Sequence, residues 1–152
     1  MTQFNPWPNN IFLRYLTYVW SSLTMIFVLP FVGFLIATEQ VVGRGWKDGA
    51  WELVTVKGSW LYKKLVMKYD AFSFGWCIFY VEEYDFNNLT VRVHERIHLQ
   101  QQIYLSIFQW IFYGLFWMTI SLFTKLDGYR ANPFEIDARI QAGQDVGELK
   151  RK

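Results

Sequence analysis

Two long stretches without a charged residue constrain this chain more than any other feature. The first extends from Tyr15 to Thr38 and the second from Leu99 to Thr124. Each exceeds the roughly 20 residues that an α-helix needs to cross the hydrocarbon core of a bilayer. Two helices that are apolar on every face would leave a chain of 152 residues too little polar sequence to cover them in water. The sequence therefore predicts an integral membrane protein, with a transmembrane helix at residues 15–38 and the lipid bilayer as a partner.

Length and composition limit the remaining possibilities. A chain of 152 residues fits one domain, so we expect residues 1–152 to form a single membrane-embedded domain. Aromatic residues make up 20% of the chain, far above ordinary use, which excludes a disordered protein. The formal net charge of +2 argues against a mainly electrostatic nucleic-acid binder, and we expect no nucleic-acid partner. The single cysteine, Cys77, excludes an internal disulfide and a cysteine-based zinc cage.

The region between the two apolar stretches, residues 40–88, is typical of a small β-sheet. Glycines separate short groups of β-branched and aromatic residues there. Residues 51–56 predict a strand, and residues 71–81, a nearly continuous apolar run that ends at two glutamates, predict a strand against a covered face. Residues 60–67 fit either a strand or a short helix. Together with the apolar helices, this region predicts an α+β membrane protein.

The clearest chemical motif is formed by His94, Glu95 and His98. On a helix, side chains four positions apart project from one face, a spacing suited to binding one zinc ion. Glu95 then lies beside the metal, where it can take a proton from water. Asn87 and Asn88 precede the motif and can cap a helix that begins just after them. The competing interpretation is a pair of structural histidines on an ordinary helix.

A catalytic zinc site of this type needs a third protein ligand and an open position for water. Two downstream carboxylates are available, Glu135 and Asp137. Asn132 as N-cap and Pro133 at the first helical position predict a helix over residues 132–143, with Glu135 in its first turn. Asp137 points about 200° away around that helix, so we favour Glu135 as the ligand and expect a supporting or surface role for Asp137. Alternatively, Glu135 only favours the helix N-terminus electrostatically.

The order His-Glu-x-x-His followed by Glu-x-x-Ala resembles the gluzincin class of zinc metallopeptidases. More closely, the second half of the chain resembles small, uncharacterised membrane-associated proteins of bacteria and phages. Those proteins combine a strand, a zinc helix rich in Gln or Arg after its second histidine, and an Asn-Pro-x-Glu helix. The matching residues here are Phe74-Gly75, His94-Glu95, His98, Gln100 to Gln102, Tyr129-Arg130 and Asn132-Pro133-Phe134-Glu135.

The resemblance implies that His94, His98 and Glu135 are the ligands of a Zn²⁺ cofactor and that Glu95 is the general base. It also implies a bacterial protein, located in the inner membrane. One departure is Arg139, because gluzincins often have at this position an aspartate that can orient a ligand histidine.

The zinc hypothesis restricts the path of the second apolar stretch. If residues 99–124 formed one straight helix of about 39 Å, His98 and Glu135 would emerge on opposite sides of the membrane and could not share a metal. We therefore expect residues 89–126 to form the zinc helix and an apolar re-entrant helical hairpin. The hairpin should turn near Gly114, the only glycine of the stretch.

Charge placement predicts the orientation of the chain. Arg14 is the only basic residue before Arg44, so with one crossing the remaining Lys and Arg lie on the side of the zinc motif. The positive-inside rule makes that catalytic side cytoplasmic.

The sequence thus predicts a zinc metallopeptidase that hydrolyses peptide or protein substrates. Tyr129, or alternatively Asn132, is expected to donate a hydrogen bond to the oxyanion, and an edge strand within residues 71–81 to align the substrate. The competing interpretation of Tyr129 is an aromatic residue at the membrane interface. The competing hypothesis is a non-catalytic membrane protein, with a structural metal or none, that acts as a partner or assembly factor.

Overall fold

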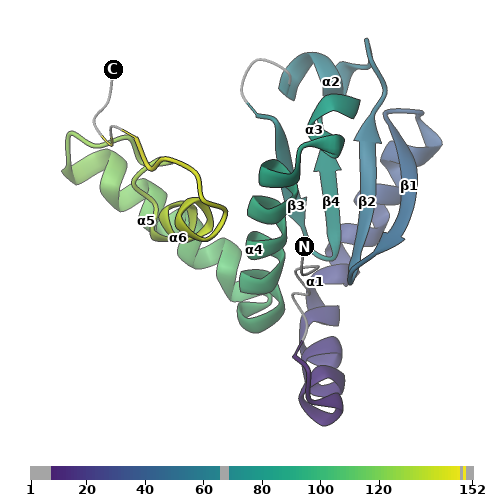
Figure 1. Ribbon diagram of the computed structural model, residues 1–152, viewed down its shortest axis with the longest axis horizontal. Helices are drawn as coiled ribbons and strands as arrows, with labels where there is room; N and C mark the ends of the chain where they lie inside the picture. Colours follow the sequence, from purple (N-terminus) through teal and green to yellow (C-terminus); the bar gives the residue numbers. More distant parts are fainter. Residues whose placement is uncertain (1–7, 66–68, 148, 150–152) are drawn as a thin grey trace.

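Helices flank both faces of a four-stranded sheet in the computed structural model, which describes residues 8–65, 69–147 and 149 (Figure 1). The helices are α1 Ile11–Ala37, α2 Trp60–Leu65, α3 Glu83–Asn87, α4 Leu89–Leu105, α5 Ile107–Phe123 and α6 Pro133–Gln141. The strands are β1 Val41–Lys47, β2 Ala50–Thr55, β3 Ala71–Phe74 and β4 Cys77–Tyr80. The chain is therefore α+β, as its sequence predicts. Of residues 60–67, which fitted either strand or helix, residues 60–65 are helical and the last two lie outside the described residues.

The sheet has the strand order β1-β2-β4-β3, so β1 and β3 are its edges. Strands β1 and β2 pair antiparallel, as do β3 and β4, while β2 and β4 pair parallel. Helix α4 lies along one face of the sheet, and α1 lies behind the other (Figure 1). The central strands therefore have both faces covered.

This layering explains the continuous apolar run in β4. Successive side chains of a strand point to opposite faces. Cys77 and Phe79 pack with α1, whereas Ile78 and Tyr80 pack with α4. All four side chains are fully buried. A strand between two helical layers thus carries apolar residues at every position, and the predicted covered strand is confirmed here.

The run at residues 71–81 nevertheless forms two strands instead of one. A turn at Gly75-Trp76 reverses the chain, so that β3 pairs with β4. Gly75 adopts φ +62°, a conformation that favours glycine. A Cβ there would also lie 2.8 Å from side-chain atoms of Met25 and Val28 on α1. The glycine therefore serves both the hairpin and the close approach of α1, and the hairpin makes β3 an edge strand.

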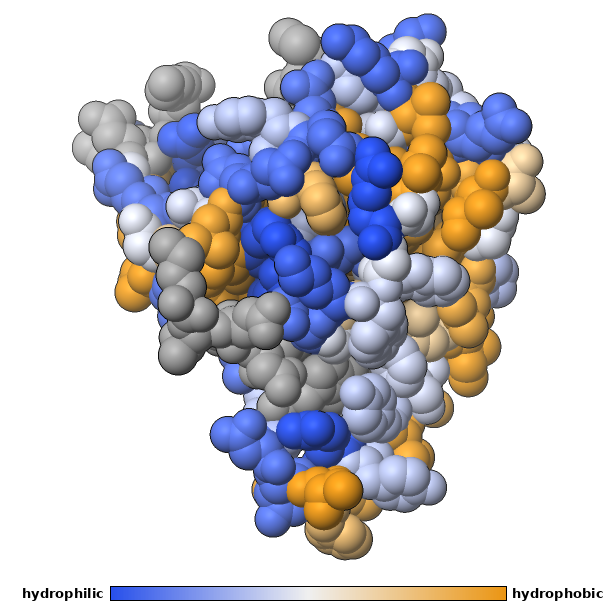
Figure 2. Space-filling model, turned by 45° about the vertical axis from the view of Figure 1, so that its right-hand side comes forward, coloured by the Kyte–Doolittle hydropathy of each residue, from blue (hydrophilic) through white to orange (hydrophobic). Residues whose placement is uncertain are grey.

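Helix α1 is long and apolar enough to span a membrane. It begins earlier than the predicted segment, because the side chain of Asn10 caps it by accepting hydrogen bonds from the N–H groups of Phe12 and Leu13. Its inner face is covered by the sheet, which contacts Met25, Val28, Val32 and Leu35. Its outward side chains are exposed and apolar, and Figure 2 shows apolar residues gathered along the right-hand side of the molecule.

The second apolar stretch is broken at Ser106 and not at Gly114. The chain bends there by 114° between α4 and α5. Ser106 has φ 52°, its N–H donates to the carbonyl of Gln102, and its hydroxyl donates to the carbonyl of Trp20 on α1. The expected turn at Gly114 is therefore wrong, because contacts with α1 hold the bend at Ser106 and the glycine stays helical within α5. The bend still returns the chain, so that α6 packs beside α4.

A buried ion cluster fixes α4 on the sheet. The carboxylate of Glu52, on β2, is 1% exposed and accepts hydrogen bonds at 2.8 Å from both Arg92 and Arg96. These arginines are four residues apart and therefore lie on one face of α4, opposite to the face of His94 and His98. The cluster thus sets the rotation of α4, and with it the direction in which the histidines point.

Candidate metal centre

His94 and His98 lie one turn apart on α4, and both side chains are buried. The helix begins where the sequence predicts, because the side chain of Asn88 accepts hydrogen bonds from the N–H groups of Thr90 and Val91. The two imidazoles turn the same nitrogen toward each other, with 3.1 Å between their Nε2 atoms. The pair is therefore an internal feature of the molecule and presents two ring nitrogens to one point.

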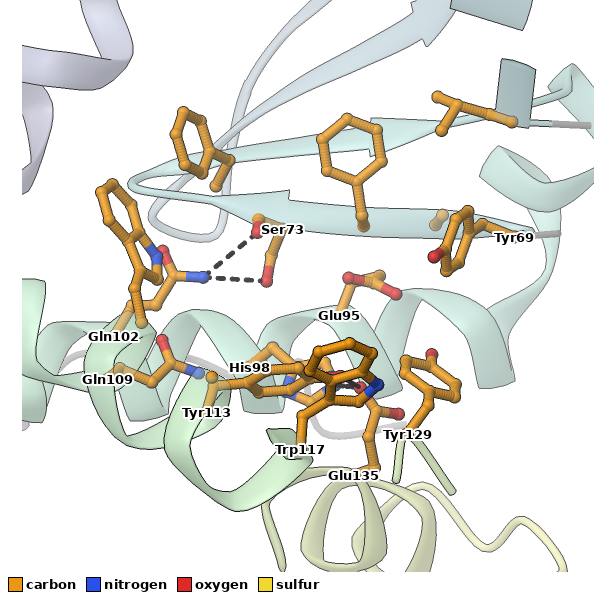
Figure 3. Close-up of a pocket in the computed structure, with 16 residues that line it drawn as sticks. Tyr69, Ser73, Glu95, His98, Gln102, Gln109, Tyr113, Trp117, Tyr129 and Glu135 are labelled. Atoms are coloured by element: carbon orange, nitrogen blue, oxygen red, sulfur yellow. Dashed lines mark hydrogen bonds and ion pairs between the residues drawn. The ribbon is translucent and has the colours of Figure 1, made fainter. Parts of the chain in front are cut away.

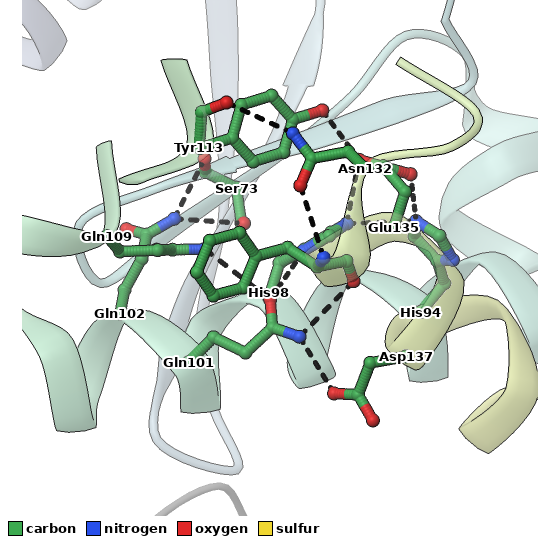
Figure 4. A network of polar contacts seen from close by, with 11 residues as sticks. Ser73, His94, His98, Gln101, Gln102, Gln109, Tyr113, Asn132, Glu135 and Asp137 are labelled. Carbon is green, nitrogen blue, oxygen red and sulfur yellow. Dashed lines mark hydrogen bonds and ion pairs between the residues drawn. The ribbon is translucent and has the colours of Figure 1, made fainter. Parts of the chain in front are cut away.

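Glu135 brings a carboxylate to that point from α6. Asn132 caps this helix and Pro133 begins it, which places Glu135 in the first turn as predicted. Its Oε1 lies 3.1 Å from Nε2 of His98, and its Oε2 lies 3.5 Å from Nε2 of His94. The three predicted ligands thus come together, although the whole of α5 lies between the two histidines and Glu135 along the chain (Figure 4).

These distances fit a metal ion. A tetrahedral zinc ion with bonds of about 2.0–2.1 Å holds its ligand atoms about 3.3–3.4 Å apart, close to the spacing of the three side chains. The donor set of two imidazoles and one carboxylate is also one that zinc prefers. In addition, Oε2 of Glu135 is buried without a hydrogen-bond partner among the described residues. His94, His98 and Glu135 can therefore hold a metal ion.

Gln101 orients one of the two histidines. Its Oε1 lies 2.9 Å from Nδ1 of His98, and its Nε2 donates to Oδ2 of Asp137 at 2.9 Å and to the carbonyl of Phe134 at 3.3 Å (Figure 4). Because both partners of Nε2 are acceptors, Oε1 must face the ring, and Nδ1 of His98 must carry the proton. Nε2 of His98 then keeps its lone pair for a metal. Asp137, for which the sequence suggested a supporting or surface role, is exposed and contacts the site through Gln101.

We expect Gln101→Leu to lower the zinc affinity by about 10- to 100-fold, the usual cost of losing a partner that orients a ligand histidine. Competition with a chelating dye measures this affinity directly. Gln100→Leu is the matched control, because it makes the same change at the residue before Gln101, where the described contacts include no hydrogen bond to His98, and it should leave the affinity unchanged. Equal affinities for both variants would show that Gln101 does not orient the ligand.

The charges of the site are strongly coupled. Burial of Glu135 acts to raise its pKa, but contacts with both imidazoles outweigh burial and hold the pKa below its ordinary value. Burial of His98 acts to lower its pKa, but the hydrogen bond and charge of Glu135 outweigh that effect and raise the pKa to about 9. A metal ion must therefore displace a proton when it binds, since zinc requires a neutral imidazole.

Glu95 lines a pocket beside the three ligands. The pocket has a volume of about 670 Å³ and lies between β3, α4 and α5. Figure 3 shows Glu95 and His98 projecting into it from α4, with Ser73 of β3 on the opposite wall. Burial raises the pKa of Glu95 to about 7, and the charges of the neighbouring histidines act against that rise. One carboxylate oxygen of Glu95 has no hydrogen-bond partner within the described part of the chain, so it can accept a proton.

The two proposed oxyanion donors have different positions. Tyr129 lines the same pocket, and burial together with the charge of Glu135 raises its pKa, so its hydroxyl stays protonated and can donate. Asn132 is fully buried, and its side-chain amide already makes hydrogen bonds to other groups. Its Oδ1 accepts from the N–H of Phe134, and its Nδ2 donates to the carbonyl of Tyr113. Asn132 therefore has a structural role.

Sequence reasoning missed a second tyrosine. The hydroxyl of Tyr113 donates to Oε1 of Glu135 at 2.9 Å and fixes the carboxylate from α5. No spacing rule points to this residue, because it comes from the middle of an apolar helix that reaches the site only through the bend at Ser106. Gln101 could have been found, since it lies three residues after His98 and therefore on the same side of α4. No protein-family model, curated protein or solved structure matches this chain.

Proposed function

We propose that this chain is a membrane-associated zinc metallopeptidase of the gluzincin type. The observation that carries the proposal is the convergence of His94, His98 and Glu135 at distances suited to zinc, beside a pocket that also contains Glu95. A structural zinc site usually has four protein ligands, whereas a catalytic site has three and an open position. Among the described residues the group of possible ligands has three members, which favours catalysis over the structural alternative.

The three metal ligands, Glu95 and Tyr129 then each have a role in peptide hydrolysis. His94, His98 and Glu135 would hold the ion, which when bound supplies Lewis acidity toward water and a carbonyl oxygen. Glu95 accepts the proton of the attacking water and passes it to the leaving amine. Tyr129 donates a hydrogen bond to the oxygen of the scissile carbonyl as negative charge develops there.

The edge of β3 is suited to align an extended peptide. The N–H of Val81 donates to the carbonyl of Asp70, which identifies 70/81, 72/79 and 74/77 as the hydrogen-bonded pairs of the hairpin. The backbone groups of Ala71 and Ser73 therefore point outward, away from β4. The carbonyl of Ser73 accepts a hydrogen bond from Gln102 on α4, which supports this direction. Both residues line the pocket, so a bound strand would pass beside Glu95.

We also propose that the protein belongs to the inner membrane of a bacterial cell, with the metal centre on the cytoplasmic side. Two features support this location. Helix α1 is long and apolar enough to insert into a bilayer, and the basic residues follow it with the single exception of Arg14. Anionic lipids give the cytoplasmic leaflet a negative surface potential, which attracts a basic part of this kind.

A peptide library digested by the purified full-length chain tests the activity. We expect cleavage products by mass spectrometry, with large apolar residues next to the cleaved bond because aromatic side chains line much of the pocket. The chelator 1,10-phenanthroline should abolish cleavage, and zinc in slight excess should restore it. A chain that carries one zinc ion and cleaves no peptide would overturn the enzymatic proposal in favour of a structural metal.

A further inference from the structure

The outward faces of α1 and α5 form one continuous apolar surface. The two helices meet at Trp20 and Phe108, whose rings stack with 6.1 Å between their centroids, and Phe108 stacks in turn on Phe112. Trp20 is 38% exposed and Phe108 is 46% exposed, so the junction itself belongs to the surface. We call these outward side chains of α1 and α5 the apolar face.

The packing of α1 restricts how this face can meet a bilayer. Met25, Val28, Val32 and Leu35 hold the C-terminal part of α1 against the sheet. The helical residues before Met25 extend only about 21 Å, less than the roughly 30 Å of the hydrocarbon core. If α1 crossed the membrane, the sheet would enter the hydrocarbon beside it, together with the open edges of β1 and β3. Unpaired backbone groups and exposed sheet edges do not occur in that region. The helix can therefore contact lipid along its outward side, but it cannot cross with the sheet attached.

The charges around the apolar face match a membrane surface. Neither α1 nor α5 contains an acidic residue. The charged residue within α1 is Arg14, near its start, and the exposed Lys125 follows the end of α5, while one exposed acidic residue, Glu39, follows the end of α1. Basic residues at the borders of an apolar surface can reach anionic headgroups while the apolar side chains stay in the acyl region. This arrangement favours a bilayer over a protein as the occupant.

The pocket and the apolar face share α5 as a wall. Tyr113, Gly114 and Trp117 line the pocket from α5, while Phe112 and Phe116 of the same helix are each 42% exposed. Trp117 belongs to both, because it lines the pocket and is also 51% exposed. A bilayer that covers the apolar face would therefore reach the rim of the pocket.

We propose that the apolar face seats the protein along one leaflet and that the pocket takes its substrate from that leaflet. The substrate class is a peptide segment anchored at the membrane, with a bulky apolar side chain that fits among Phe72, Phe74 and Trp110. The substrate part rests on the proposed peptidase function, whereas the seating on lipid does not. This geometry replaces the crossing expected for residues 15–38 with a helix that lies in the membrane surface.

Environment-sensitive labels test the seating. In a Cys77→Ser background, single cysteines at Phe27, Phe112 and Phe116 are labelled with a nitrobenzoxadiazole dye, and the full chain is added to vesicles of phosphatidylethanolamine and phosphatidylglycerol. Fluorescence at these positions should rise several-fold and shift to the blue. Tyr84 on α3 is the matched control, as it is an aromatic residue of similar or greater exposure away from the face, and its label should not respond. Labels on α5 that behave like Tyr84 would overturn the proposal, as would protection of the same labels in a dimer without vesicles.

Depth-dependent quenching separates a helix that lies along the leaflet from one that crosses. Labels at Leu16, Leu23 and Phe34 sample α1 from end to end, and all three positions are exposed. A helix in the surface places them at similar shallow depths, so a lipid quencher near the headgroup should act on each more strongly than one at the end of the acyl chain. A crossing helix would instead place Leu23 near the midplane. Strongest quenching of Leu23 by the deep probe would contradict the proposed seating.

Presentation of one peptide in two ways tests the substrate class. A sequence cleaved in the library experiment is offered free or linked to a palmitoyl chain on the same vesicles. Confinement to one surface should accelerate cleavage of the anchored form, on the order of 10²-fold. Equal rates would overturn the inference and leave the peptidase function intact. If the labels on α5 respond to lipid but no peptide is cleaved, the peptidase function and the substrate class are overturned. The seating on lipid then remains supported.

Discussion

Purified wild-type chain should contain about one zinc ion, and His94→Ala or His98→Ala should contain almost none, because two remaining ligands bind zinc weakly. Elemental analysis after dialysis measures the content. Thermal unfolding gives a second readout, since a ligand at about 100 times its Kd stabilises the folded state by about 2.7 kcal/mol. Zinc should therefore raise the Tm of the wild type and leave the Tm of both variants unchanged.

A control separates loss of the metal from loss of the fold. Gln100→Ala changes a position of α4 that lies two residues after His98 and outside the group of ligands, and it should retain zinc and its effect on the Tm. Circular dichroism of the alanine variants should show the helices intact, because Arg92 and Arg96 still hold α4 to Glu52. If both histidine variants retain zinc, or if the wild type lacks zinc after growth with added zinc, the proposed metal centre is contradicted.

Glu95→Gln should retain zinc and lose peptide hydrolysis. Glutamine keeps the size of the side chain and one acceptor oxygen, but it cannot take a proton from water. Loss of a general base lowers kcat by about 10²–10⁴-fold, and we expect KM to change much less, since binding along β3 does not use this carboxylate. Steady-state kinetics on a peptide from the library experiment, together with zinc analysis of the same sample, measure both effects.

Glu83→Gln is the matched control for the general base. Glu83 lies on α3, and its carboxylate pairs with Arg44 at the surface, outside the residues that line the pocket. Surface ion pairs contribute at most about 1 kcal/mol, so this variant should keep both zinc and activity. Full activity of Glu95→Gln would assign the proton transfer to another group, and loss of zinc in that variant would show that Glu95 supports the metal and leave its catalytic role unsupported.

The sequence by itself determined the local parts of the site. The spacing of His94 and His98 fixes them on one side of any helix that contains them. Asn88 and Asn132 mark where α4 and α6 begin, because their side chains cap backbone N–H groups of the first turn. The position of Glu135 in the first turn of α6 follows from the same cap. Such features depend on neighbours within about four residues, so they can be read without knowledge of the fold.

Tertiary contacts alone decided the rest. A run without charges does not record where it bends, and the sequence favoured Gly114 for its flexibility. The bend instead lies at Ser106, where a hydroxyl reaches the carbonyl of Trp20 on a helix from the other end of the chain. The sequence also did not reveal the hairpin at Gly75. Strands that are buried on both faces form a continuous apolar run without alternation, so the pattern does not show where one strand ends and the next begins.

The same limit applies to the partners of the metal ligands. Gln101 follows His98 by three residues and was within reach of a spacing argument, but Tyr113 was not, because the angle between α4 and α5 delivers it to Glu135. Whether α1 crosses a membrane or lies along it was likewise undetermined by hydropathy. Hydropathy measures how apolar the helix is, whereas the sheet packed against its inner face decides which side of the helix stays exposed.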